Sequence, residues 1–127
     1  IRVRETCAPQ AVRVWHATGR QGRTPGGCLG GRGFAFISYT GVLQPCGFLD
    51  VHSGNLRDYG FNMKQAYAES KVFKDLRQTT RYSGACGVCC FNQACGGCRA
   101  RAYAATGDFM ASDPSCPLAG SRTTGRF

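Results

Sequence analysis

The sequence predicts an α+β fold, in the form of a small, loop-rich domain with a β-hairpin and short helices. Its 127 residues suffice for one domain but not for a complete eight-fold barrel, which needs roughly 200 residues or more. Its eighteen glycines are about twice the usual share of ~7%, and glycine is unfavourable inside helices and strands. Segments with strand-like or helix-like spacing of apolar residues are present but short.

The strand signal is clearest in the segment that precedes Cys46. Residues 33–38 are rich in strand formers, residues 39–41 (Tyr-Thr-Gly) indicate a turn, and residues 42–44 form a second short run that Pro45 ends. This pattern predicts a β-hairpin that is followed directly by a cysteine.

Helical spacing dominates residues 62–79. Two groups of apolar residues each follow i, i+3, i+4 spacing, and Asn62 and Ser70 stand where each group needs an N-cap. The groups are Met63, Ala66 and Tyr67, then Val72, Phe73 and Leu76. A stripe of this kind indicates core packing rather than a cofactor site.

The other segments carry weaker signals. The apolar run at residues 12–15 predicts a short strand followed by a loop, and residues 99–106 predict a helix with Gly107 after its last residue. Residues 84–98 hold five cysteines and four glycines without a helical period. We expect a metal-binding or disulfide-bonded knot there.

The charge balance is strongly basic. Sixteen Lys and Arg residues against seven Asp and Glu residues give a formal charge of +9, and such a surplus is typical of proteins that bind polyanions, nucleic acid included. The arginines are dispersed from Arg2 to Arg126, however, without a run of like charges and without a nucleic-acid-binding motif. Metal-bound thiolates would also offset part of this charge. The sequence therefore disfavours a nucleic-acid partner.

The location of the protein follows from what the sequence lacks. No apolar stretch approaches the ~18 residues of a membrane-spanning helix, and no charged start is followed by the apolar run of a signal peptide. We expect a cytoplasmic protein with no membrane span. Because the first residue is Ile1 rather than Met, we also expect a fragment, a processed product or the ordered part of a longer protein.

The nine cysteines are the most informative feature of the sequence. They are Cys7, Cys28, Cys46, Cys86, Cys89, Cys90, Cys95, Cys98 and Cys116. A disulfide framework needs an oxidising compartment, to which nothing else in the sequence points. Cysteines only three residues apart more often bind a metal or perform redox chemistry.

Zinc and iron–sulfur clusters compete as the metal. A zinc ribbon separates two C-x2-C pairs by roughly 15–20 residues, whereas only five residues separate Cys89 from Cys95, which is a short loop for closing one tetrahedral site. An iron–sulfur cluster spreads its thiolates farther apart and often takes them from a dense segment plus a remote cysteine. Glycines within the dense segment let the backbone approach closely and offer N–H groups to sulfur.

The cysteine spacing resembles that of a known family. Cys28, Gly41 and Cys46 give C-x12-G-x4-C, and residues 86–98 give C-x2-C-x5-C-x2-C, with Cys116 behind them. This pattern resembles the seven-cysteine signature of the SPASM domain, the auxiliary-cluster domain of many radical SAM enzymes. The fold that the resemblance implies is a SPASM-like iron–sulfur domain.

Further stretches resemble the radical SAM proteins of tetrapyrrole maturation, which serve d-type haem synthesis and the sirohaem-dependent haem pathway. They are residues 6–9 (Thr-Cys-Ala-Pro), residues 44–49 (Gln-Pro-Cys-Gly-Phe-Leu), residues 95–108 and residues 113–116 (Asp-Pro-Ser-Cys). The resemblance reaches residue 118 and covers nearly all of the chain before it.

The resemblance also implies a division of the chain into three parts. Residues 1–27 would be an N-terminal segment, as the remnant of a preceding barrel. Residues 28–118 would be the cluster-binding domain, and residues 119–127 a flexible tail.

The ligands that the resemblance implies form two sets, for one or two clusters of the 4Fe–4S type. Cluster I would be bound by Cys28, Cys46 and Cys98, and cluster II by Cys86, Cys89, Cys95 and Cys116. Cluster I then lacks a fourth protein ligand, for which Cys7 and Cys90 are candidates, as are a substrate and water.

Radical SAM chemistry itself needs a C-x3-C-x2-C motif, which this sequence lacks. Cys86 and Cys90 have the first spacing, but residue 93 is Gln. S-adenosylmethionine is therefore expected as a cofactor only if a barrel precedes the chain.

Two arginines follow the dense cysteine segment on the last predicted helix. Arg99 and Arg101 have the fork-shaped head group that pairs with carboxylates, and the resemblance makes the propionates of a tetrapyrrole candidate ligands for them. A solvated helix face, or charge balance beside an anionic cluster, accounts for them equally well.

The function that the sequence predicts is electron transfer or substrate anchoring by bound iron–sulfur clusters, next to a radical SAM barrel that acts on a tetrapyrrole. A stand-alone iron–sulfur subunit of a larger redox complex is a second hypothesis. A structural zinc-binding module is a third.

Overall fold

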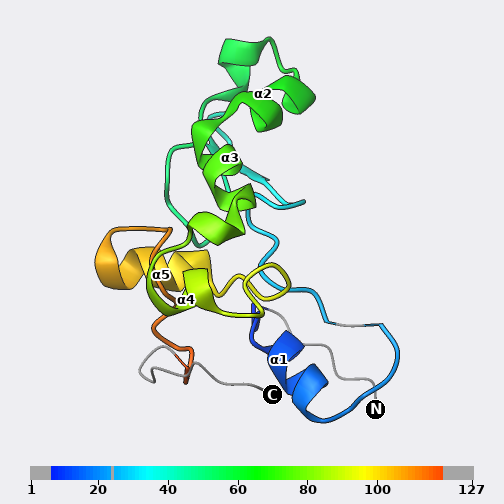
Figure 1. Ribbon diagram of the computed structural model, residues 1–127. Helices are drawn as coiled ribbons and strands as arrows, with labels where there is room; N and C mark the ends of the chain where they lie inside the picture. The colour runs from blue at the N-terminus through cyan, green and yellow to red at the C-terminus, as the bar shows by residue number, and fades with distance from the viewer. Residues whose placement is uncertain (1–6, 24, 119–127) are drawn as a thin grey trace. The chain divides into compact units, whose positions relative to one another are not determined.

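The computed structural model describes residues 7–23 and 25–118 and divides into two compact units. Unit 1 consists of the described residues of Ile1–Cys28 and Thr80–Phe127, and unit 2 of Leu29–Thr79. Short helices and one two-stranded sheet make up the regular structure of the described ranges (Figure 1). The predicted α+β class is confirmed.

The hairpin of unit 2 forms where the sequence predicts it. Strands β1 (Phe36–Ile37) and β2 (Leu43–Gln44) are antiparallel, with Phe36 opposite Gln44. The turn between them needs a left-handed residue, which Gly41 supplies with a φ of +87°. Each strand has only two residues. A loop bonds β2 as well, because the N–H of Leu43 donates to the carbonyl of Gly54 (2.8 Å).

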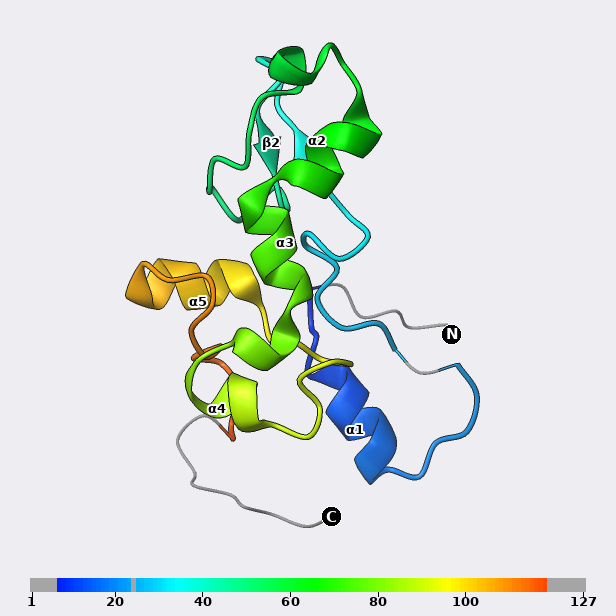
Figure 2. The same ribbon diagram turned by 45° about the horizontal axis from the view of Figure 1, so that its top comes forward.

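The predicted helical segment of unit 2 is two helices, α2 (Met63–Glu69) and α3 (Lys71–Arg77), which Figure 2 shows in succession. Their apolar residues form the core of this unit, and Ala66, Phe73 and Leu76 are fully buried. The side chain of Asn62 caps α2, as predicted, by accepting a hydrogen bond from the N–H of Gln65 (3.1 Å). Ser70 occupies the N-cap position of α3, but its side chain makes no capping bond.

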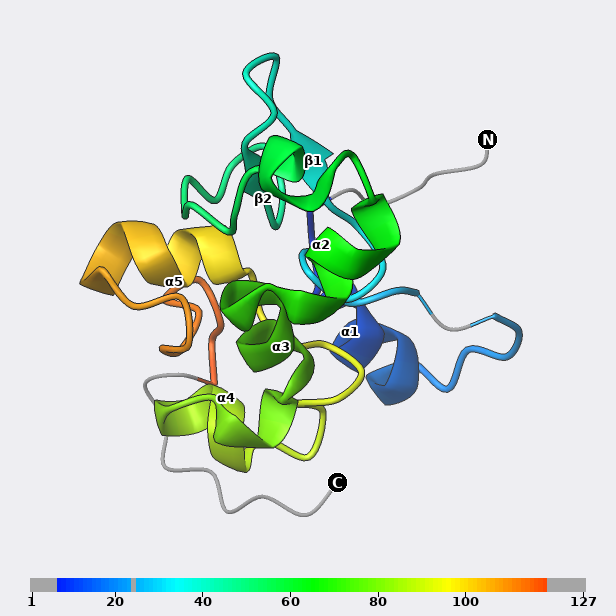
Figure 3. The same cartoon turned by 90° about the horizontal axis from the view of Figure 1, so that it is seen from above.

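Two short helices of the 3₁₀ type were not predicted. One, η1 (Leu56–Tyr59), follows the turn at Gly54 and is capped by the side chain of Asn55. The other, η2 (Thr79–Arg81), lies at the boundary between the units. Within unit 2, α2 packs against η1 and against α3, which follows it directly (Figure 3). The hydroxyl of Tyr67 on α2 donates to the carbonyl of Gly31 (2.8 Å).

Unit 1 contains α1 (Ala11–Ala17), α4 (Gly84–Val88) and α5 (Arg99–Thr106). The predicted strand at residues 12–15 is wrong, because this run is part of α1. A short apolar run does not distinguish a strand from a helix, and here a turn at Pro9 starts the helix and only Val12 is buried. Within residues 84–98, where the sequence shows no helical period, the structure contains the short helix α4.

The helix predicted at residues 99–106 is confirmed as α5, and Gly107 follows it in the left-handed conformation. The predicted flexible tail, residues 119–127, lies outside the described residues. In the ranges that the structure describes, no helix combines the length and apolar character that a membrane crossing requires. The predicted domain boundaries and the cytoplasmic location stay predictions.

Candidate metal centre

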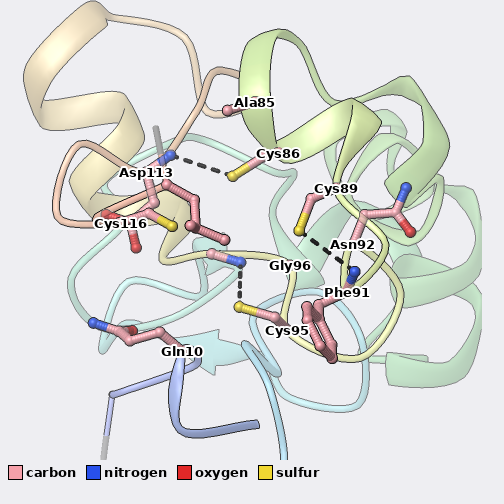
Figure 4. Close-up of a pocket in the computed structure, with 12 residues that line it drawn as sticks. Gln10, Ala85, Cys86, Cys89, Phe91, Asn92, Cys95, Gly96, Asp113 and Cys116 are labelled. Atoms are coloured by element: carbon pink, nitrogen blue, oxygen red, sulfur yellow. Dashed lines mark hydrogen bonds between the residues drawn. The ribbon is translucent and has the colours of Figure 1, made fainter. Parts of the chain in front are cut away.

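Four cysteines of unit 1 surround one cavity (Figure 4). Cys86 lies on α4 and Cys89 directly follows that helix. Cys95 comes from the loop that leads to α5, and Cys116 from the segment beyond it. They are the four cysteines that the family resemblance implies for cluster II, so the fold brings this predicted set together.

Backbone amides point at three of these sulfur atoms. The N–H of Gly97 donates to Cys95 Sγ, that of Asp113 to Cys86 Sγ and that of Phe91 to Cys89 Sγ, each over 3.4 Å. Dashed lines in Figure 4 mark these bonds. Amide donors of this kind stabilise thiolates and tune a metal that thiolates bind.

The close approach of backbone to sulfur depends on a glycine. Gly97 is buried and has a φ of +60°, which an L-residue with a side chain rarely adopts. A Cβ at this position would lie 3.1 Å from Cys86 Sγ, 2.9 Å from Asp113 Cβ and 2.6 Å from an Arg99 Nη atom. Any side chain at residue 97 would therefore push into the wall of the cavity.

Arg99 is buried beside the cysteines, with 1% of its surface exposed. One of its terminal nitrogens donates to the carbonyls of Phe109 (3.1 Å) and Ala111 (2.6 Å), and the other to Cys86 Sγ (3.5 Å). Its guanidinium carbon lies 4.3 Å from the centre of the Tyr82 ring. A solvated helix face, one of the sequence-based readings, does not describe this residue.

Arg101 makes the other contacts of this helix face. Its guanidinium pairs with both carboxylate oxygens of Asp113, at 3.1 and 2.8 Å, and donates to the carbonyl of Cys7 (3.3 Å). Asp113 also accepts hydrogen bonds from the N–H groups of Cys98 (2.8 Å) and Ser115 (3.0 Å). Asp113 thereby ties the start of α5 to the segment that carries Cys116.

The electrostatics of this pair favour the charged forms. Burial alone would raise the pKa of the Asp113 carboxyl, but the hydrogen bonds from Arg101, Cys98 and Ser115 outweigh it and lower that pKa. The same hydrogen bond raises the pKa of Arg101. The ion pair therefore persists at neutral pH.

The surroundings of two thiols in the cavity favour the neutral, protonated form rather than the charged form. Burial raises the pKa of Cys89 and of Cys95, and repulsion from the sulfurs of Cys86 and Cys116 raises both further. Without a metal these thiols are therefore protonated at neutral pH. Because metals bind thiolates, a metal that enters the cavity must displace protons.

The residues around the cavity fit an iron–sulfur cluster. Four sulfurs around a cavity form the ligand set of such a cluster, amide donors point at three of them, and Gly97 leaves room where a Cβ would intrude. Arg99 Nε is buried without a hydrogen-bond partner among the described residues. Within the same residues, no three His, Cys, Asp or Glu side chains are arranged around a single metal ion.

The three cysteines predicted as ligands of cluster I are divided between the two units. Cys28 and Cys98 belong to unit 1 and Cys46 to unit 2, so the ligand set of cluster I stays a prediction. Cys7 and Cys90 are exposed, and all nine cysteines are free thiols in the structure. The sequence did not indicate that Asp113 would bond the start of α5, although its position three residues before Cys116 was a signal for a role at this site.

The sequence was compared with those of known proteins. No family model matches the sequence. The chain is 39% identical to an AdoMet-dependent heme synthase of Nitratidesulfovibrio vulgaris, over 98% of its own length and 36% of the relative's. It is also 39% identical to the AdoMet-dependent heme synthase of Methanosarcina barkeri, over 91% of the chain and 36% of that protein. The chain is homologous to part of the AdoMet-dependent heme synthases.

A second group of relatives extends this homology. The chain is 33% identical to a PqqA peptide cyclase of Rhodopseudomonas palustris, over 74% of the chain and 26% of that protein. Both groups are radical SAM enzymes, and the peptide cyclases contain a SPASM domain. The predicted resemblance to radical SAM proteins of the haem branch is thus confirmed. The chain spans about a third of the length of the heme synthases that it matches.

Proposed function

We propose that this chain is an auxiliary iron–sulfur domain that works with a radical SAM barrel in haem biosynthesis. Cys86, Cys89, Cys95 and Cys116 bind a 4Fe–4S cluster, and Cys28, Cys46 and Cys98 bind a second one. The bound clusters supply one-electron transfer. The substrate class is a tetrapyrrole that carries carboxylates, in line with the names of the heme-synthase relatives reported above.

One observation carries the cluster proposal. Four cysteine sulfurs from three separate segments surround a single cavity, and three of them already accept N–H bonds. A disulfide framework would bring its sulfurs together in pairs, and structural zinc would draw four ligands onto one ion. A cluster needs its four sulfurs arranged around a larger group, and this arrangement supports it.

The lengths of the relatives support a barrel as the partner. The heme synthases are about three times longer than the stretch that this chain matches, which leaves room in them for a catalytic barrel of roughly 200 residues or more. A stand-alone iron–sulfur subunit remains the second hypothesis from the sequence, but no observation in the structure favours it. S-adenosylmethionine is proposed as the cofactor of the barrel rather than of this chain.

Metal analysis tests the proposal. Iron, zinc and acid-labile sulfide are measured on anaerobically prepared protein, together with the EPR spectrum after reduction. Two clusters predict about eight irons and eight sulfides per chain, on the basis of four of each in a 4Fe–4S cluster. Zinc without sulfide would select the structural zinc module, and fewer than about two irons per chain would exclude the two-cluster version.

Neighbouring cysteines provide a matched pair of variants. Cys89→Ala removes a sulfur that lines the cavity, whereas Cys90→Ala removes the exposed thiol next to it. We expect Cys89→Ala to lose about half of the iron of a two-cluster protein and Cys90→Ala to keep it. Equal iron contents in the two variants would contradict the assignment of Cys89.

A further inference from the structure

We propose that Arg99 is a positioning residue that raises the reduction potential of the cluster bound by Cys86, Cys89, Cys95 and Cys116. The inference rests on the proposed function, because it needs that cluster. It assigns to Arg99 a role different from binding a substrate carboxylate.

The charged head group of Arg99 is buried. The guanidinium of Arg99 is enclosed, with 1% of the residue exposed, and a buried cation is costly unless it is paired or fully hydrogen-bonded. Two carbonyls and the Tyr82 ring provide part of this compensation. None of these partners carries a full negative charge. The thiolates of a bound cluster would provide that charge.

The guanidinium of Arg99 points toward one sulfur of the cavity. Arg99 begins α5, and its guanidinium reaches Cys86, which lies on α4. An Nη atom donates to Cys86 Sγ over 3.5 Å, while the Nε atom is buried without a partner. Cys86 Sγ also accepts the N–H of Asp113. This sulfur is thus the one with both a backbone and a cationic side-chain donor among the bonds that the structure records.

The effect on the cluster follows from charge. Reduction by one electron from an external donor makes the cluster and its thiolates more negative, and the guanidinium of Arg99 is a cation beside one of those thiolates. A fixed cation and a hydrogen-bond donor next to sulfur therefore stabilise the reduced form more than the oxidised form. Arg99 consequently raises the potential.

The second arginine of α5 is the internal comparison. The guanidinium of Arg101 donates two hydrogen bonds to the carboxylate of Asp113 in this chain rather than to a sulfur. A Lys substitution keeps the charge at either position but replaces the planar fork with a single flexible ammonium. Both variants keep the positive charge of α5, but only Arg99→Lys alters a hydrogen bond to sulfur. A comparison of the two therefore distinguishes the effect of that bond from the effect of the charge.

The experiment is an EPR-monitored redox titration, with dithionite as the electron donor, of anaerobically prepared whole chain. Wild type, Arg99→Lys, Arg99→Met and Arg101→Lys are compared at equal iron and sulfide content. We expect one cluster transition to move to lower potential in Arg99→Met and, by a smaller shift, in Arg99→Lys. Arg101→Lys should leave that transition in place.

The outcomes distinguish the inference from the function on which it rests. Wild-type protein that holds no iron and sulfide would overturn both. Wild-type protein that holds clusters, with unchanged potentials in both Arg99 variants, would overturn the inference alone. The same holds if Arg101→Lys shifts the transition as much as Arg99→Lys does.

A second measurement needs no variant and covers the case in which Arg99→Met fails to fold. Wild-type protein grown with ¹⁵N-arginine is reduced and examined by pulsed EPR. If the label is placed in the guanidinium group, a guanidinium within hydrogen-bond distance of Cys86 Sγ should give a ¹⁵N coupling that protein with unlabelled arginine lacks. The absence of that coupling at the cluster would overturn the inference.

Discussion

Gly97 and Gly107 have similar backbone conformations, with φ of +60° and +74°, but very different surroundings. No atom lies within 4 Å of a Cβ built at Gly107, whereas one built at Gly97 meets Arg99, Asp113 and Cys86. The same residue type therefore serves two purposes. Gly107 ends a helix, and Gly97 lets the backbone pass between a buried cation and a sulfur.

This difference can be measured with two alanine variants. Gly107→Ala should cost roughly 1–2 kcal/mol of unfolding free energy, the penalty for a left-handed L-residue. Gly97→Ala should cost about 1–3 kcal/mol more, because its Cβ overpacks the wall of the cavity, and it should also lower the iron content. The measurement is urea unfolding with iron analysis. Equal costs and equal iron contents would contradict the close packing at Gly97.

At the scale of elements, the N-cap residues of α2 and α3 give similar signals in the sequence but differ in their hydrogen bonds in the structure. Asn62 and Ser70 both stand at N-cap positions and were both predicted as caps. Only Asn62 caps its helix, because its side-chain oxygen accepts a hydrogen bond from the N–H of Gln65. The hydroxyl of Ser70 is buried and has no hydrogen-bond partner among the described residues.

Alanine substitutions at the two N-cap positions should therefore have different effects on the free energy of unfolding. Asn62→Ala should lower the free energy of unfolding by about 1 kcal/mol, the usual effect of losing a side-chain cap. Ser70→Ala should leave it unchanged or raise it slightly, because it removes a buried hydroxyl that lacks a partner. Urea unfolding of the two variants checks the order. A larger loss for Ser70→Ala would show that its hydroxyl has a partner.

The elements of unit 1 were the harder ones to predict. The segment that forms α1 contains a short apolar run that suits a strand as well as a helix. A turn at Pro9 precedes the helix, and Val12 is its buried residue. α4 has five residues and none of them is buried. A helix this short is marginal alone, so its sequence carries almost no helical signal.

At the scale of the whole molecule, the two units have unequal cores. The fully buried apolar side chains of unit 2 include Leu43, Leu49, Phe73 and Leu76. In the described part of unit 1, the buried apolar side chains are those of Pro9, Val12, Tyr82 and Ala102. Because burial of apolar surface is the main stabilising contribution to a fold, we expect the stability of unit 1 to depend more on the proposed metal than that of unit 2.

Removal of the metal should therefore affect the two units differently. Metal binding that occurs only in the folded state adds to its stability. We expect an iron chelator to speed amide hydrogen exchange in α4, α5 and the cysteine-rich loop between them, with much smaller changes in α2 and α3. Mass spectrometry of peptides from both units checks this. An equal acceleration in both units, or none in unit 1, would contradict it.

Sequence patterns were sufficient for the hairpin, for α2, α3 and α5, and for the grouping of Cys86, Cys89, Cys95 and Cys116. These features depend on local spacing, turn residues and caps, or on a family-specific order of cysteines, and all of these can be read along the chain. Three of those four cysteines lie within ten residues of one another, so their proximity is largely local as well.

The contacts that give the cavity its chemistry could not be read in this way. Arg99 looks like any exposed helical arginine in the sequence, yet tertiary packing buries it between Tyr82, two carbonyls and Cys86. Asp113 likewise gains its role from bonding residues 98 and 101 across a turn of the chain. Burial and hydrogen bonding between distant residues arise only when the chain is folded, because no local pattern specifies which segments meet.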